Sequence, residues 1–253
     1  GDNTVPGAIT LAAHSTIRSQ SGTLTLNSGT AISGSGYNML FQGGGTILVA
    51  SSIGTVAGGV NKIDAGTLIF TGASTYSGAT TISNGTFIMH GTNTSTAVDM
   101  KSGTTLFGVG SVGRLTVSGA VGPGTNTIGI GRLAVTNLVM NNGATYRVQV
   151  GNYADNTDRD YIQNSGDSTI NATVTLYVDS TLLSNWDNTQ AKSWAIIVGG
   201  ITSTNGFVLD ETYWAADKGG GSFILSATGG NLVLSFEPLS EDAPTVTTDA
   251  ISE

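Results

Sequence analysis

The sequence of 253 residues contains no cysteine, two histidines and few charged side chains. Without cysteine, the chain can form neither disulfide bonds nor metal sites that depend on thiolate ligands. Charged residues account for 10% of the sequence, whereas an average globular domain contains about 25%. No run of 18 apolar residues is present, so we expect no transmembrane helix.

The few charges are unevenly distributed along the chain. Residues 1–150 contain six basic and three acidic residues, whereas residues 151–253 contain three basic and fourteen acidic residues. The whole chain therefore carries a formal charge of −8. Because the cations are few and scattered, the sequence indicates no nucleic-acid partner.

Glycine is abundant, with 37 residues, and several glycines begin the same short phrase. The phrase is a glycine, usually followed by threonine, and then a run in which apolar and hydroxyl residues alternate. It begins at Gly22, Gly45, Gly66, Gly85 and Gly103, at intervals of 23, 21, 19 and 18 residues. Such alternation beside a glycine is typical of β-strands. A repeat of about 20 residues is typical of stacked architectures, so the sequence predicts an all-β parallel solenoid with about three strands in each repeat.

The repeat also predicts which side chains form the core. Leu24, Ile47, Leu68 and Phe87 each lie two residues after a repeat glycine, so we expect them at equivalent positions inside successive rungs. Thr67 should face outward, because neighbouring side chains point to opposite faces of a strand. Hydroxyl side chains suit the outer surface, since they can stack and form hydrogen bonds where like charges would repel.

Three regions of the chain differ in regularity. Residues 1–110 are the most regular, residues 111–236 have longer loops, and residues 237–253 contain five acidic and no basic residues. We expect β-helix repeats in the first region, further rungs and a cap in the second, and a flexible acidic linker in the third. Trp186, Trp194 and Trp214 lie in the second region, where large aromatic side chains can close the open end of the core.

The segment GTLIFTGASTYSGATTISNGTFIMHG, residues 66–91, resembles the passenger-associated repeat of bacterial autotransporters. The shared pattern is a Gly-x-Leu strand, a Ser-Thr-Tyr-x-Gly turn, a Thr-Ile strand and a second Gly-Thr strand. The motif Val121-Gly122-Pro123-Gly124 is similar to a passage near the C-terminal end of such passengers. The resemblance covers about residues 20–236.

This resemblance implies a right-handed, single-stranded parallel β-helix with a C-terminal cap, exported across the bacterial outer membrane to the cell surface or secreted. It implies that residues 111–236 contain an autochaperone-like region and that the partner is an outer-membrane β-barrel translocator. The segment would then be a stalk that assists its own translocation and folding and presents or forms an adhesin or virulence surface. Whether it is a spacer or binds host cells, matrix or copies of itself stays open at this point.

Residues suited to metal binding or to catalysis on polysaccharides are few. Asp155, Asp158 and Asp160 form the densest acidic cluster. Their spacing matches neither the helix-flanked calcium loop nor the calcium-binding nonapeptide, so we interpret them as a solvated loop between rungs. Asp64 and Asp99 are the only acidic residues between positions 20 and 150, too few for the carboxylate row of a polysaccharide-cleaving β-helix.

A nucleophilic active site is not indicated either. His14 and His90 belong to rungs several repeats apart, and the sequence has no Gly-x-Ser-x-Gly motif,. We therefore expect no catalytic residues, no cofactor or metal site and no small-molecule substrate. A polysaccharide-active β-helix is the alternative from another functional class.

Overall fold

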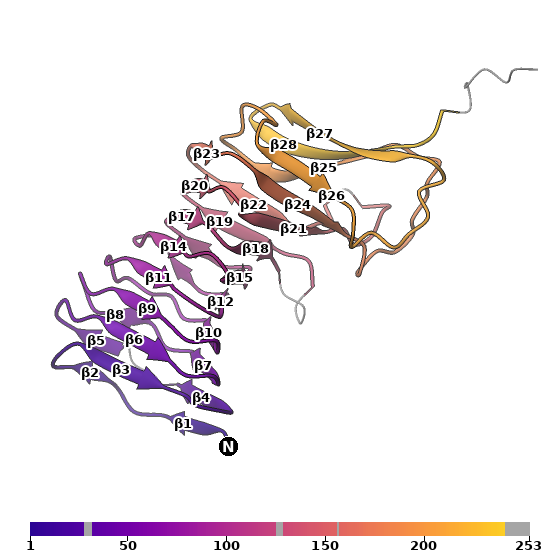
Figure 1. Ribbon diagram of the computed structural model, residues 1–253. Helices are drawn as coiled ribbons and strands as arrows, with labels where there is room; N and C mark the ends of the chain where they lie inside the picture. Colours follow the sequence, from indigo (N-terminus) through magenta and orange to yellow (C-terminus); the bar gives the residue numbers. More distant parts are fainter. Residues whose placement is uncertain (28–31, 125–128, 156, 241–253) are drawn as a thin grey trace, which may run out of the picture.

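The computed structural model describes residues 1–27, 32–124, 129–155 and 157–240. These residues form 28 strands that stack into one elongated body, with the N-terminus at one end and the last strands at the other (Figure 1). The described residues contain no helix, and therefore none that is long and apolar enough to cross a membrane. The predicted all-β class is confirmed.

The largest sheet runs along the whole body and contains ten strands that pair in parallel. In spatial order its strands are β1 (Asn3–Val5), β4 (Thr23–Leu26), β7 (Thr46–Val49), β10 (Thr67–Phe70), β12 (Thr86–Met89), β15 (Thr105–Gly108), β18 (Ala120–Pro123), β21 (Thr145–Gln149), β24 (Val174–Asp179) and β26 (Phe207–Asp210). The phrases that follow the first four repeat glycines supply β4, β7, β10 and β12, which are consecutive in this sheet.

Two further sides of the body are also built mainly from parallel strands, apart from the last strands of the seven-stranded sheet. The eight-stranded sheet contains β3 (Ser15–Arg18), β6 (Met39–Gln42), β9 (Val60–Lys62), β11 (Thr80–Ile82), β14 (Val98–Met100), β17 (Arg114–Val117), β20 (Asn137–Met140) and β23 (Ser168–Ile170). The third side is divided between two sheets. The three-stranded sheet contains β2 (Thr10–Leu11), β5 (Ile32–Gly34) and β8 (Ile53–Gly54). The seven-stranded sheet contains β13 (Thr92–Asn93), β16 (Ser111–Val112), β19 (Arg132–Val135), β22 (Tyr161–Asn164), β25 (Lys192–Val198), β28 (Asn231–Glu237) and β27 (Ser222–Thr228).

Each rung takes one strand from each side in turn. The strands β4, β5 and β6 are followed by β7, which returns to the first side and pairs with β4. Because a strand pairs with its equivalent one repeat later, neighbouring strands run parallel. The fold is a parallel β-helix, as the repeat of about 20 residues predicts.

The fifth repeat phrase departs by one residue from the expected register. Thr86 pairs with Thr105 rather than with Thr104, and Phe87 pairs with Leu106. Thr104 instead lies in the preceding turn, where it is 1% exposed and its hydroxyl donates to a backbone carbonyl at 2.6 Å. The turn at Gly103 is one residue longer than its predecessors, which glycine spacing alone does not reveal.

The third side of the body is interrupted between β10 and β11. Residues 71–79 form no named strand and are joined to the neighbouring rungs by irregular hydrogen bonds and by a bridge between Ala73 and Thr92. The side chain of Tyr76, in the middle of this loop, is 1% exposed. The loop therefore still contributes a large aromatic ring to the core.

At the C-terminal end of the body, strand pairing changes from parallel to antiparallel. β28 pairs antiparallel with both β25 and β27. The β27–β28 hairpin has the two-residue loop Gly229-Gly230, with φ of 58° and 80°, as a type I′ turn requires. The predicted acidic linker begins later than expected, since Glu237 still belongs to β28. Most of that linker, residues 241–253, lies outside the described residues.

Candidate functional surface

The outward side chains of the ten-stranded sheet form two regular columns. The first column consists of threonines from five consecutive strands: Thr23, Thr46, Thr67, Thr86 and Thr105. Two residues further along the same strands, the second column contains Thr25, Leu48, Ile69, Ile88 and Phe107. All ten side chains are half-buried and uncharged. We call these two columns the outer threonine face.

Glycines at the turns border the outer threonine face. A Cβ atom on Gly66 would collide with the carbonyl oxygen of Gly45 in the preceding rung, and one on Gly91 would collide with that of Gly72. Successive turns therefore stack through bare backbone, which side chains would force apart. This close approach explains the glycine at Gly66, whereas the repeat glycine Gly103 has open space around it and a φ of 79° that favours glycine,.

The four predicted core residues form an inward column in adjacent rungs. Leu24 pairs with Ile47, Ile47 with Leu68, and Leu68 with Phe87. The last three are at most 3% exposed. Leu24 is only half-buried, and the strand beyond it places the polar Asn3 at the next position of the column. The inward column is therefore fully enclosed from β7 onward.

Lys62 occupies a core position that the repeat phrases do not reveal. Its partners in register are Phe41 and Ile82, both fully buried, and Lys62 itself is only 2% exposed. Its ammonium group donates to three backbone carbonyls in the nearby turns, those of Ile63 (2.7 Å), Asp64 (2.6 Å) and Asn84 (3.2 Å). Burial lowers the pKa of this ammonium group, although the charge of Asp64 opposes the effect. Strand alternation from the buried Val60 is the sequence signal that predicts this inward orientation.

The three tryptophans assigned to the cap lie in one aromatic cluster. The ring centroid of Trp186 is 4.8 Å from that of Trp214 and 4.6 Å from that of Tyr153, whose ring lies 5.7 Å from Trp194. The rings of Phe223 and Phe236, from the C-terminal hairpin, also contact Trp186. Trp194 is 1% exposed, whereas the other two tryptophans are half-buried. The cluster thus joins the loop before β25 to the final hairpin.

The acidic loop of Asp155, Asp158 and Asp160 is solvated only in part, which corrects the sequence interpretation. Asp155 is exposed, but Asp160 is 1% exposed. The carboxylate of Asp160 accepts the backbone N–H groups of Gly131 at 2.8 Å and Gln149 at 3.1 Å. Burial raises the pKa of Asp160 to about 7 despite these two donors. Spacing along the chain could not show which of the three aspartates turns inward.

Four turns in the C-terminal region share an Asp-x-Thr signature that explains part of its excess of acidic residues. In each turn the aspartate carboxylate accepts the backbone N–H of the threonine two residues later. The pairs are Asp155 and Thr157, Asp179 and Thr181, Asp187 and Thr189, and Asp210 and Thr212. Hydrogen bonds from threonine lower the pKa of Asp155, Asp187 and Asp210. These carboxylates stabilise turns, and the Asp-x-Thr spacing in the sequence could have predicted this role.

Of the side chains considered for catalysis, only His90 and Asp99 lie in one rung, that of β12 to β14, whereas His14 and Asp64 belong to earlier rungs. Asp64 accepts a backbone N–H at 3.0 Å, and Asp99 pairs with Lys101 at 2.5 Å. His14 accepts a backbone N–H through Nδ1 at 2.9 Å, whereas burial lowers the pKa of His90. In the part of the chain that the structure describes, no three His, Asp or Glu residues are grouped to hold a metal ion.

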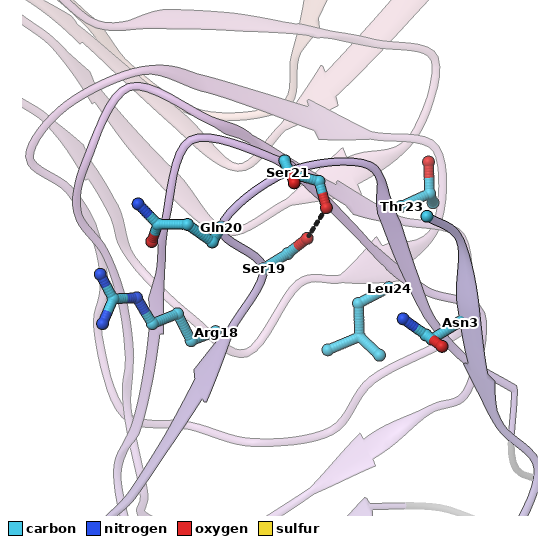
Figure 2. A pocket seen from close by; sticks show the side chains of 8 residues that line it. Asn3, Arg18, Ser19, Gln20, Ser21, Thr23 and Leu24 are labelled. Carbon is cyan, nitrogen blue, oxygen red and sulfur yellow. Dashed lines mark hydrogen bonds between the residues drawn. The ribbon is translucent and has the colours of Figure 1, made fainter.

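A hollow of about 280 Å³ opens at the N-terminal end of the body. Figure 2 shows Arg18 and Gln20 on one side of it and Asn3 and Leu24 on the other. Leu24 is the one large apolar side chain among its lining residues. Small-molecule pockets are lined mostly by apolar side chains, so this polar lining does not suggest such a site.

Comparison with known proteins identifies one segment of the chain. A family model described as passenger-associated-transport-repeat matches residues 60–89. A search of curated proteins gave no match. The matched residues run from β9 to β12 and include the buried Lys62, the core residue Leu68 and the loop of Tyr76.

Proposed function

Since residues 60–89 are an autotransporter passenger repeat, we propose that the chain is the β-helical stalk of a passenger domain, displayed at the bacterial cell surface or secreted. The stalk assists its own translocation and folding and holds more distal parts of the passenger away from the membrane. Its partner is an outer-membrane β-barrel translocator. The observation that carries this proposal is the family match. The strands of the matched segment pair in register with those of the neighbouring rungs.

The stacking pattern supports folding one rung at a time. Each strand of the β-helix pairs only with the equivalent strands of the preceding and following rungs, so a segment leaving a pore needs only one folded rung as its template. The absence of cysteine means that no disulfide has to form during this process. We assign an autochaperone-like role to the C-terminal cap, because its aromatic cluster and antiparallel hairpin offer a folded end on which rungs can stack.

A display experiment tests this function. The chain is fused between a signal peptide and an autotransporter β-barrel, and its exposure is measured by adding protease to intact cells. We expect the wild-type chain to reach the surface as a protease-resistant product. Leu68→Asp should remove that resistance, whereas Thr67→Asp, one residue away on the outer face, should preserve it. Retention of the wild-type chain inside cells whose β-barrel is correctly inserted would contradict the proposal.

The outer threonine face favours a second role as an adhesin. Leu48, Ile69, Ile88 and Phe107 form a half-exposed apolar column on an uncharged face. Contiguous apolar surface on a soluble protein often marks an interaction site. We propose that two copies of the rod associate through this face, in preference to a host-cell or matrix ligand.

Paired variants test the adhesive role. Ile69→Lys introduces a charge on the outer threonine face, whereas Thr81→Lys introduces the same charge at a half-buried, outward position of the eight-stranded sheet. Light scattering over a concentration series should show weaker association for Ile69→Lys and wild-type association for Thr81→Lys. Equal behaviour of the two variants would exclude this face as the contact.

We propose no enzymatic role for the chain. Asp64 is engaged by a backbone N–H and Asp99 by Lys101, whereas glycoside cleavage requires two carboxylates on opposite sides of one bond. Incubation with polysaccharides should release no reducing ends. Measurable release that is lost in an Asp64→Asn or Asp99→Asn variant would establish the alternative.

A further inference from the structure

Two buried carboxylates lie close to the C-terminal end of β21. Asp179 ends β24 and is 0% exposed, while Asp160 lies just before β22 and is 1% exposed. Gln149 connects them, because its partner in β24 is Asp179 and its backbone N–H donates to Asp160 at 3.1 Å. The two carboxylates therefore share one corner, where the ten-stranded sheet approaches the seven-stranded sheet.

The two carboxylates have unequal partners. The guanidinium group of Arg147 donates to Asp179 Oδ2 through both Nε and Nη2. Among the residues that the structure describes, the backbone N–H groups of Gly131 and Gln149 donate to Asp160, and no cation pairs with it. A buried carboxylate without a cation is costly to ionise, and two amide donors reduce this cost without supplying a positive charge.

The other ionisable groups around Asp160 do not neutralise it. The Tyr146 hydroxyl is fully buried and donates to a backbone carbonyl at 2.5 Å. The guanidinium group of Arg159 donates to a backbone carbonyl at 3.0 Å and lies over the ring of Tyr161 at 4.6 Å. The Asp158 carboxylate accepts a different backbone N–H at 2.6 Å. None of these contacts places a cation directly on the carboxylate of Asp160.

We propose that Asp160 is a proton-binding site that makes the stability of the C-terminal cap depend on pH in the mildly acidic to neutral range. Protonation removes the uncompensated charge from the corner that links Gly131, Gln149 and β22. The cap is then more stable in a mildly acidic medium than in an alkaline one. This inference concerns the cap alone and does not depend on the function proposed above.

The direction of the effect follows from linkage. The carboxyl of Asp160 has a pKa of about 7 in the folded chain, whereas an aspartate in an unfolded chain has a pKa of about 3.9. Between these values the folded chain holds a proton that the unfolded chain has released. The free energy of unfolding therefore falls as the pH rises through this window, and this contribution levels off above pH 7.

Unfolding of the full chain at several pH values tests the proposal. All three tryptophans lie in the cap, so their fluorescence reports on this end of the rod. The denaturant midpoint should be higher at pH 5 than at pH 8, and Asp160→Asn should abolish most of that difference. Asp158→Asn, two residues away at a less buried position, should retain it. A wild-type midpoint that is flat or rises with pH, or an unchanged slope in Asp160→Asn, would overturn the proposal.

A direct titration keeps the test valid if Asp160→Asn fails to fold. Carbon-13 NMR of the wild-type chain labelled at aspartate carboxyls should show a carboxyl that titrates with a midpoint near pH 7. If every aspartate of the folded chain titrates below about pH 5, Asp160 is ionised at neutral pH and the proposal is wrong.

Discussion

In residues 1–110 the same side-chain positions recur rung after rung, whereas residues 111–240 continue this stacking and add contacts that occur only once. The repeat region stacks inward side chains such as Ile47, Leu68 and Phe87 directly on one another. The cap instead depends on the aromatic cluster around Trp186 and on the ion pair between Arg147 and Asp179. The two regions share one continuous ten-stranded sheet but achieve stability by different means.

This difference predicts how far the destabilising effect of a substitution should extend along the rod. In a stack, each rung is stabilised mainly by its two neighbours, so a defect in the repeat region destabilises adjacent rungs. A defect in the cap removes contacts for which no equivalent exists elsewhere in the chain. We therefore infer that the cap is the most stable unit of the molecule and that the repeats extend from it.

The largest effect is expected for Leu68→Asp in the repeat region. Leu68 is 0% exposed. Burial of a carboxyl there costs about 4 kcal/mol at neutral pH, where the group takes up a proton, in addition to about 2–5 kcal/mol for the lost leucine side chain. The matched variant Thr67→Asp lies on the outer threonine face and should cost about 1 kcal/mol or less. The urea midpoints of the two variants measure their losses of stability. Equal losses, or a larger loss for Thr67→Asp, would show that the inward and outward columns are assigned to the wrong faces.

The next effect concerns the cap. Trp194 is 1% exposed and contacts Tyr153 within the aromatic cluster, so Trp194→Ala should reduce the free energy of unfolding by about 3–5 kcal/mol. Tyr213→Ala removes an aromatic ring that is 50% exposed and lies outside this cluster, where it contacts Tyr177 and Arg147. This variant should cost about 1–2 kcal/mol. Thermal unfolding followed by circular dichroism compares the two. If Trp194→Ala had a small effect, the aromatic cluster would not be a main source of the stability of the cap.

Lys62→Met should produce the smallest of these losses and tests a contact that occurs once inside the repeat region. Methionine fills a similar volume but leaves three backbone carbonyls without the ammonium donor, at a cost of about 1–3 kcal/mol. Lys101→Met removes an ammonium group from a side chain that is 52% exposed and should change stability by about 0.5 kcal/mol or less. The urea midpoints of Lys62→Met and Lys101→Met measure the two losses of stability. If Lys62→Met were more stable than wild type, the carbonyl contacts of Lys62 would not contribute to stability.

The sequence alone predicted the periodic part of the fold. Glycine spacing and strand alternation predicted a parallel stack and placed Leu68 and Thr67 on opposite faces, because both signals repeat with the rung. The same spacing did not reveal that the strand after Gly103 begins at Thr105 and not at Thr104, since one extra residue in the turn leaves the repeat phrase recognisable. Periodic signals thus determine the strands but not the length of each turn.

Features that depend on contacts between residues far apart in the sequence could not be predicted in the same way. Asp160 belongs to an acidic cluster in the sequence, yet its burial depends on backbone amides of Gly131 and Gln149, which lie 29 and 11 residues away along the chain. The three tryptophans could be assigned to a cap by their size and position. The contacts of Trp186 and Trp194 with Tyr153 depend on the fold of the loops between β21 and β25 and could not be predicted.

Native-state hydrogen exchange of the full chain tests most directly the claim that the cap is the most stable unit. Mass spectrometry of peptides from the whole rod would give the opening free energy of each rung under one set of conditions. We expect the slowest exchange in β24, β25 and β28, with protection decreasing through β12 and β7 toward β1. Slowest exchange in β7 to β12, with the cap exchanging first, would contradict the account.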